Sequence, residues 1–193
     1  MYPNFRTVLS ATALAIAGLA FVGCTTTSKG EGASGMSSHA PVDAQIDATL
    51  SKLYTNVPGS RELVAKSKGV LVFPEVVGGS FIVGAQYGRG ALRVNGRTEA
   101  YYSTTAGSLG LQAGAQSKAV IYLFTTQQAL DKFRSGNGWT VGADATVAFA
   151  NIGANGSVDT NTLQQPVIGF VLTNVGLEAG VSLQGAKIDR VRT

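Results

Sequence analysis

The 193-residue chain has only one cysteine, Cys24, and one histidine, His39. A single cysteine excludes a disulfide bond within the chain, and so few His and Cys side chains argue against a metal site built from them. Catalysis by a Ser-His-Asp or Cys-His arrangement is disfavoured too, because His39 lies in a polar stretch and Cys24 directly follows an apolar run. Paired carboxylates remain possible in principle, but no spacing brings two together. We therefore expect no metal, no cofactor and no enzymatic activity.

Basic residues are missing from a long stretch of the chain. Residues 135–186 contain three acidic residues and no basic one, whereas residues 61–134 contain nine Lys or Arg and four Asp or Glu. This asymmetry indicates an anionic partner on one side of the molecule. Charge that serves only solubility would give the same pattern, so both interpretations stay open.

The apolar run near the N-terminus is short for a membrane-spanning helix, with about 15 residues from Val8 to Phe21 against the ~20 that a span needs. Arg6 is the only charge before it, which is typical of an export signal. Cys24 follows Gly23 at the end of the run, and this arrangement resembles the lipobox of bacterial lipoproteins. The resemblance implies a diacylglyceryl group on the Cys24 sulfur, with several acyl chains giving firm attachment. Thr25, in place of Asp, implies sorting to the outer membrane.

Three segments follow from this division: a signal peptide over residues 1–23, a flexible tether over 24–40 and a folded domain over 41–193. The tether is rich in Thr, Ser and Gly and has little to bury. Apolar residues from Val42 to Leu53 then recur at helical spacing, which predicts an amphipathic helix that ends before Pro58 and packs on a sheet. A short helix follows, with Ser60 as its N-cap and Gly69 as its stop.

Glycine is abundant, with 25 residues, 19 of them between Gly69 and Gly185, as in a strongly curved sheet. Apolar and polar or small residues alternate in three segments, which predicts strands with one apolar face: Gly107–Gln116, Val141–Phe149 and Gly176–Gly185. Other patterns predict a helix over Thr126–Arg134, a hairpin turn at Asn95–Gly96 and the strands Val70–Phe73, Phe81–Tyr87, Ala91–Val94, Glu99–Thr104, Lys118–Phe124 and Val167–Thr173. The expected fold class is mainly β (α+β), an antiparallel β-barrel core of about eight strands with about three helices packed outside.

Three blocks of sequence resemble the SYLF domain family, also called Ysc84-like. They are Lys66–Pro74, in which lysine and glycine precede an apolar strand ending in proline, Gly138–Ala145, and the glycine-rich block Gly176–Gly185. The resemblance covers the chain from about Val42 to the C-terminus. It implies a β-barrel core with helices packed outside it, and a domain that binds membrane lipids.

Eight basic residues form the candidate lipid-binding set: Lys66, Lys68, Arg89, Arg93, Arg97, Lys118, Lys132 and Arg134. Arginine pairs with phosphate oxygens in two places, whereas lysine acts as a point charge. Near an anionic surface each contributes about 1 kcal/mol. The family resemblance implies phosphoinositides as ligands in eukaryotic members, while a bacterial lipoprotein meets other anionic lipids. Export disfavours nucleic acid as a partner. The alternative is a tethered structural or protein-interaction module of the envelope without lipid specificity.

The lipobox resemblance predicts that Cys24→Ser abolishes acylation, because the thiol is the only acceptor for the diacylglyceryl group. The measurement is metabolic labelling with a clickable palmitate analogue, followed by gel fluorescence. Labelling that persists in the variant at the wild-type level would contradict the anchor.

Overall fold

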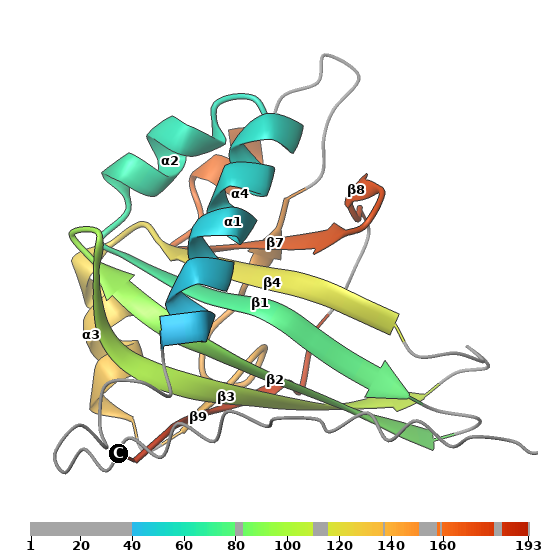
Figure 1. Cartoon of the computed structure of the whole chain (residues 1–193). Helices are drawn as coiled ribbons and strands as arrows, with labels where there is room; N and C mark the ends of the chain where they lie inside the picture. The colour runs from blue at the N-terminus through green and yellow to red at the C-terminus, as the bar shows by residue number, and fades with distance from the viewer. Residues whose placement is uncertain are drawn as a thin grey trace, which may run out of the picture. The chain divides into compact units, whose positions relative to one another are not determined.

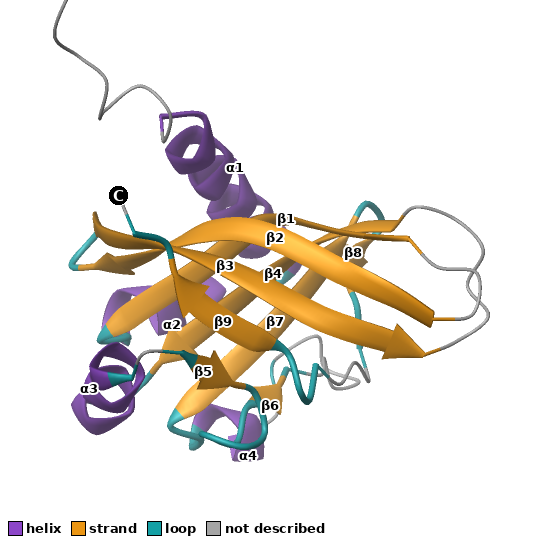
Figure 2. Cartoon of the chain, turned by 90° about the horizontal axis from the view of Figure 1, so that it is seen from below, coloured by secondary structure: helices purple, strands orange, loops and turns teal. Residues whose placement is uncertain are grey.

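A single curled sheet organises the protein in this computed structural model (Figures 1 and 2). The structure describes residues 40–79, 83–109, 116–136, 138–150, 158, 160–179 and 183–192. These residues belong to one compact unit, Ser34–Thr193. The expected signal peptide, Cys24 and residues 24–39 of the expected tether lie outside the described residues.

Nine strands form the sheet within the described residues. They are β1 (Gly69–Gly79), β2 (Val83–Val94), β3 (Arg97–Leu109), β4 (Gln116–Phe124), β5 (Trp139–Thr140), β6 (Ala148–Phe149), β7 (Val167–Thr173), β8 (Gly176–Leu177) and β9 (Lys187–Arg190). Their order is β5-β9-β3-β2-β1-β4-β7-β6, with β8 beside β7, and all pairs are antiparallel except β6–β7. The curled sheet is a half-barrel, and the mainly β fold class is confirmed.

Four helices accompany the sheet in the described part of the chain: α1 (Ala40–Asn56), α2 (Ser60–Lys66), α3 (Gln127–Ser135) and α4 (Thr160–Leu163). The first three were predicted, and α4 was missed because it is a single turn. The prediction that Ser60 is the N-cap of α2 is wrong. Gly59 is the N-cap, in a left-handed conformation with φ 79°, and buried Ser60 donates its hydroxyl to Leu53 O at 3.2 Å. The hydroxyl therefore ties α2 to the end of α1.

The central strands are buried on both faces, as the apolar run Val70–Phe73 predicts. Val70 and Val72 belong to a cluster on the outer face, while Leu71 and Phe73 belong to a cluster on the inner face. Side chains of β4 and β7 alternate between the same two clusters. Alternation therefore sorts apolar side chains between two cores, because both faces are covered.

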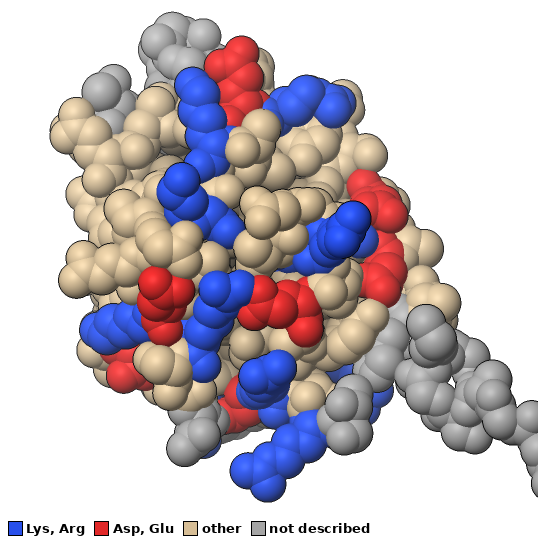
Figure 3. All heavy atoms as spheres, turned by 90° about the vertical axis from the view of Figure 1, so that its left-hand side faces the viewer, with Lys and Arg blue, Asp and Glu red and all other residues tan. Residues whose placement is uncertain are grey.

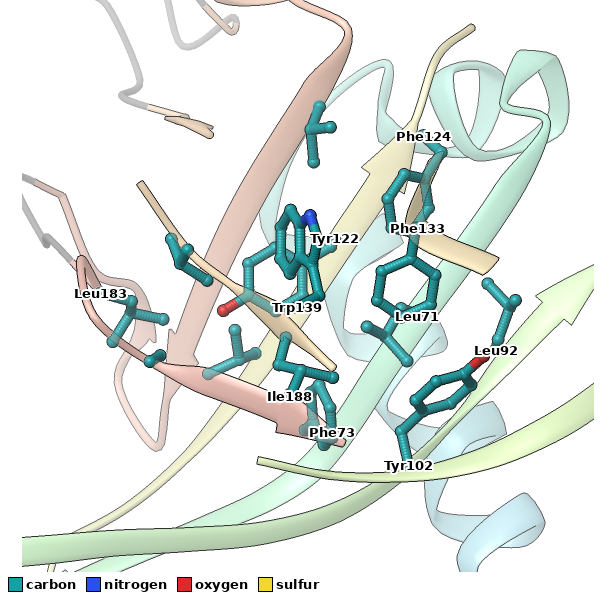
Figure 4. Packing of buried hydrophobic residues seen from close by; sticks show 14 of the residues in the cluster. Leu71, Phe73, Leu92, Tyr102, Tyr122, Phe124, Phe133, Trp139, Leu183 and Ile188 are labelled. Carbon is teal, nitrogen blue, oxygen red and sulfur yellow. The ribbon is translucent and has the colours of Figure 1, made fainter. Parts of the chain in front are cut away.

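Aromatic side chains fill the inner core (Figure 4). Trp139 on β5 lies 5.8 Å from Tyr122 on β4, between ring centroids, although four strands separate β5 from β4 in the sheet. This contact is possible only because the sheet curls toward this face. Phe133 of α3 packs on Trp139 at 5.6 Å and on Phe124 at 4.9 Å, so α3 closes one end of the inner core. Burial raises the pKa of the Tyr122 hydroxyl.

Helix α1 covers the outer core. Its buried side chains Ile46, Leu50 and Leu53 belong to the cluster formed by the outer-face residues of β1, β4 and β7. Packing of this helix on the sheet, rather than on a membrane surface, was expected, because its polar face carries Asp43 and Asp47. The prediction that it ends before Pro58 is confirmed.

Strand β2 is continuous through Gly88–Gly90, where the sequence analysis placed a break between two strands. The pairing of β1 with β2 shifts register between Val72 and Glu75, which marks a β-bulge around Pro74. A Cβ on Gly90 would lie 2.0 Å from Val72 O, and one on Gly88 would lie 2.8 Å from Glu75 O. These glycines let the strands approach at the bulge, and they do not interrupt the strand.

The three alternating segments are not single strands, which corrects the sequence analysis. In Gly176–Gly185 only Gly176 and Leu177 form a strand, residues 180–182 lie outside the described residues, and Gly176 and Gly185 have positive φ. Residues 107–109 end β3, whereas Gln116 begins β4, and two strands, β2 and β1, lie between β3 and β4 in the sheet; residues 110–115 are not described. In Val141–Phe149 a turn intervenes, in which Gly142 has φ 88° and the Asp144 carboxylate accepts the Thr140 N–H at 2.6 Å. Strand β9 went unpredicted.

The close approach at the bulge predicts that Gly90→Ala lowers the free energy of unfolding by about 1–3 kcal/mol, because the added methyl overlaps a backbone carbonyl. Gly107→Ala is the matched control, since a Cβ there meets nothing within 4 Å. Urea unfolding followed by far-UV circular dichroism measures both variants. Equal stabilities of the two variants would show that the β1–β2 spacing tolerates a side chain.

Candidate functional site

Six of the eight predicted basic residues come from elements that meet at one end of the sheet. There β1 begins, β2 and β4 end and α3 begins, and the Lys68 N–H donates to Phe124 O at 2.8 Å. This surface, called the basic end, comprises Lys66, Lys68, Arg93, Arg97, Lys132 and Arg134. Lys and Arg side chains spread over this side of the molecule, with acidic side chains between them (Figure 3).

Three members of the basic end are held by interactions within the protein. Arg93 reaches α1, where Nη1 lies 2.5 Å from Asp47 Oδ1 and Nη2 donates to Asp43 O at 3.1 Å. Arg134 forms a forked pair with Glu99, with Nε 2.8 Å from Oε1, and this hydrogen bond raises the pKa of Arg134. Lys132 donates to Asp144 O. Partners within the protein therefore offset part of the positive charge of these three residues.

The other three members are available to a partner. Lys66, Lys68 and Arg97 are exposed and form no ion pair within the described residues. They come from the end of α2, the entry to β1 and the first residue of β3, directly after the β2–β3 turn. That turn is the predicted Asn95–Gly96 hairpin, with φ values of 52° and 76° that suit a type I′ turn.

Arg89 and Lys118 lie apart from the basic end. Arg89 pairs in register with Glu75, and Lys118 pairs with Val76. Val76 is about 23 Å along β1 from Gly69 at about 3.3 Å per residue. Arg89 is exposed, and its Nε donates to the Tyr87 hydroxyl at 3.0 Å, which raises the pKa of Arg89. The structure therefore does not gather all eight residues into one surface.

A cleft of about 550 Å³ adjoins the basic end, between α1, α2 and the β2–β3 turn. Its lining includes two arginines, Arg61 and Arg93. The Arg61 guanidinium stacks on the ring of Tyr54, with its central carbon 4.3 Å from the ring centroid. Burial raises the pKa of Tyr54, while the charges of Arg61 and Arg93 oppose this shift.

Sequence reasoning missed Arg61 as a site residue. Tyr54 is in the last turns of α1 and Arg61 in the first turn of α2, and the bend at Gly59 brings the two side chains together. Seven positions separate them across a helix break, so no helical periodicity relates them. The only sequence signal for this contact was that Tyr54 and Arg61 lie in amphipathic segments on either side of Pro58–Gly59.

Two further features bear on the possible chemistry. Among the residues that the structure describes, no group of three or more His, Cys, Asp or Glu side chains could hold a metal ion. None of the helices in the described ranges combines the length and the apolar character that a membrane span requires.

The comparison with protein families gives one match. Residues 105–192 match the family model Ysc84, described as "Las17-binding protein actin regulator". This part of the chain is therefore similar to the Ysc84 (SYLF) family, as the resemblance of its sequence blocks implies. The matched range begins in β3, so it contains Lys132 and Arg134 but not the α2 and β1 part of the basic end. No curated protein matches the chain significantly.

The contacts of Arg93 predict that it anchors α1. Arg93→Met removes its hydrogen bonds to Asp43 and Asp47, and we expect the free energy of unfolding to fall by about 1–2 kcal/mol. Amide hydrogen exchange should speed up most in α1. Arg97→Met is the control, because Arg97 is exposed and has no ion pair in the part of the chain that the structure describes. Equal exchange in both variants would contradict an anchoring role.

Proposed function

We propose that the protein is a lipid-anchored component of the bacterial cell envelope whose Ysc84 domain weakly binds anionic phospholipid head groups through the basic end. Attachment is through acyl chains on Cys24, at the outer membrane. The protein acts by binding and not by catalysis. The observation that carries the proposal is the convergence of three exposed cations, Lys66, Lys68 and Arg97, at one end of the sheet, none of which forms an ion pair within the described residues.

The physical basis is the attraction of a basic surface to anionic lipid. Each Lys or Arg near such a surface contributes about 1 kcal/mol, so three unpaired cations give a weak interaction that the anchor reinforces by proximity. The attraction is screened over a Debye length of about 8 Å at physiological salt. Binding should therefore be strongly salt-dependent. Arg93, Lys132 and Arg134 add less, because internal partners offset their charges.

A protein partner is the second candidate. The description of the family model names a Las17-binding protein and an actin regulator, which is a protein-interaction role. In that case the anchor only tethers the domain, and the basic end has an acidic protein surface as its partner.

Vesicle co-sedimentation separates the two candidates. Residues 34–193, which lack Cys24, are first checked for folding by circular dichroism. They are then mixed at low salt with phosphatidylcholine vesicles that do or do not contain phosphatidylglycerol or phosphatidylinositol phosphates. We expect binding only to anionic vesicles.

The matched variants test the basic end. Lys66→Ala with Lys68→Ala should weaken binding about tenfold or more, since two contributions of about 1 kcal/mol are lost. Arg89→Ala with Lys118→Ala removes the same charge elsewhere and should have a smaller effect. The lipid proposal is wrong if anionic vesicles bind no better than neutral ones, or if the first double variant binds like the wild type.

A further inference from the structure

The cleft between α1, α2 and the β2–β3 turn has the dimensions of a small-molecule site. Its volume of about 550 Å³ falls within the roughly 300–1,000 Å³ of ligand pockets. Its walls come from three elements that Ser60, Arg93 and the Asn95–Gly96 turn hold in place. The cleft is therefore formed by the fold itself.

Arg61 lines the cleft and lies over the ring of Tyr54. It forms no ion pair among the described residues. The N–H groups of a guanidinium lie in one plane, where they can donate to two oxygens of one anion. Contact with the ring restricts the Arg61 side chain before a ligand arrives, which reduces the entropy lost on binding.

Arg93, whose side chain is 14% exposed, also lines the cleft. Asp43 and Asp47 fix its guanidinium. Asp47 also lines the cleft and would repel an anion, but its side chain is 70% exposed, so water screens its charge. Asp43 and Asp47 offset the charge of Arg93, so Arg61 supplies the uncompensated positive charge of the lining within the described residues.

The remaining lining is amphipathic. Leu50, Val64 and Val70 supply apolar surface, while Ser51, Ser67 and Asn95 supply polar groups. A suitable ligand therefore combines one strongly anionic group with a small body that can lie on apolar side chains.

We propose that this cleft binds a phosphate monoester, with the phosphate between Arg61 and Arg93 and the ester group over Leu50, Val64 and Val70. A phosphate monoester fits better than a monocarboxylate, because it carries up to two charges and three acceptor oxygens for two guanidinium groups. The inference rests on the proposed function only in part. Arg93 belongs to both surfaces, but Arg61 is in the cleft alone. The phosphate could be that of a lipid such as phosphatidic acid or that of a soluble ester.

Isothermal titration of the full chain in dodecyl maltoside micelles tests the inference. The soluble probe is glycerol 3-phosphate, the lipid probe is phosphatidic acid in the same micelles, and glycerol is the uncharged control. We expect saturable binding of at least one phosphate probe and none of glycerol. Binding of both probes or of glycerol 3-phosphate alone supports a soluble source, and binding of phosphatidic acid alone supports a lipid source.

Arg61→Gln should weaken the binding about tenfold, because it removes a charged donor to the phosphate. Arg61→Lys should weaken it less, since the charge remains. Lys187→Gln is the matched control, because Lys187 is an exposed cation on β9 outside the cleft. Arg61 is exposed on α2, so unchanged thermal unfolding should confirm that the variants fold.

The inference is overturned if neither phosphate probe binds, or if Arg61→Gln binds like Lys187→Gln. These results are separable from the vesicle test. Loss of vesicle binding in the Lys66 and Lys68 double variant, with glycerol 3-phosphate binding intact, refutes neither proposal. The protein could also bind glycerol 3-phosphate in an Arg61-dependent way and fail to bind anionic vesicles. That result would support the cleft inference and show that the membrane proposal is wrong.

Discussion

Burial of β1, β4 and β7 on both faces is the constraint on which the rest of the structure depends. Side chains of these strands alternate between an inner core around Tyr122 and an outer core under α1. Each face must therefore be covered, because apolar surface left in water is unfavourable. Helix α1 covers the outer face. On the inner face, the curl of the sheet brings Trp139 of β5 and Phe133 of α3 over the central strands.

The same packing explains where the candidate site lies. A helix that crosses one end of the outer face needs a fixed position, and Arg93 provides it through Asp43 and Asp47. Because α1, α2 and the β2–β3 turn meet at that end, their polar side chains are close together without contributing to either core. The cleft and the basic end are consequences of how the outer core is closed.

Residues of the same type have different roles at this end. Arg93 and Arg134 are committed to carboxylates, and their charges support the fold. Lys66, Lys68 and Arg97 have no such partners within the described residues, so their charges are available to a membrane or a protein. Arg61 is intermediate, since Tyr54 orients it without neutralising it. The Tyr101 hydroxyl donates a hydrogen bond to the Asp43 carboxylate. Burial and this hydrogen bond raise the pKa of Tyr101 to about 12.

Local features were predictable from the sequence because their causes are local. The period of apolar residues in α1, the Thr126 cap of α3, the Asn95–Gly96 turn and the apolar runs of β4 and β7 all depend on neighbouring residues. The eight candidate basic residues were also visible in the sequence, but not which of them lie together or which are already paired.

Tertiary structure decided the rest. Glycine-rich alternation, most regular in Gly176–Gly185, did not specify a long strand, because strand pairing requires a partner in register. Among the described residues of this segment, only Gly176 and Leu177 have one. Gly88 and Gly90 are explained by a bulge in the neighbouring strand and not by a break in their own. The stacking of Arg61 on Tyr54 and the pairing of Arg93 depend on how α1 and α2 pack on the sheet. The sequence by itself determined the helices, the turns and the apolar central strands, whereas only long-range packing decided which charges remain free to bind.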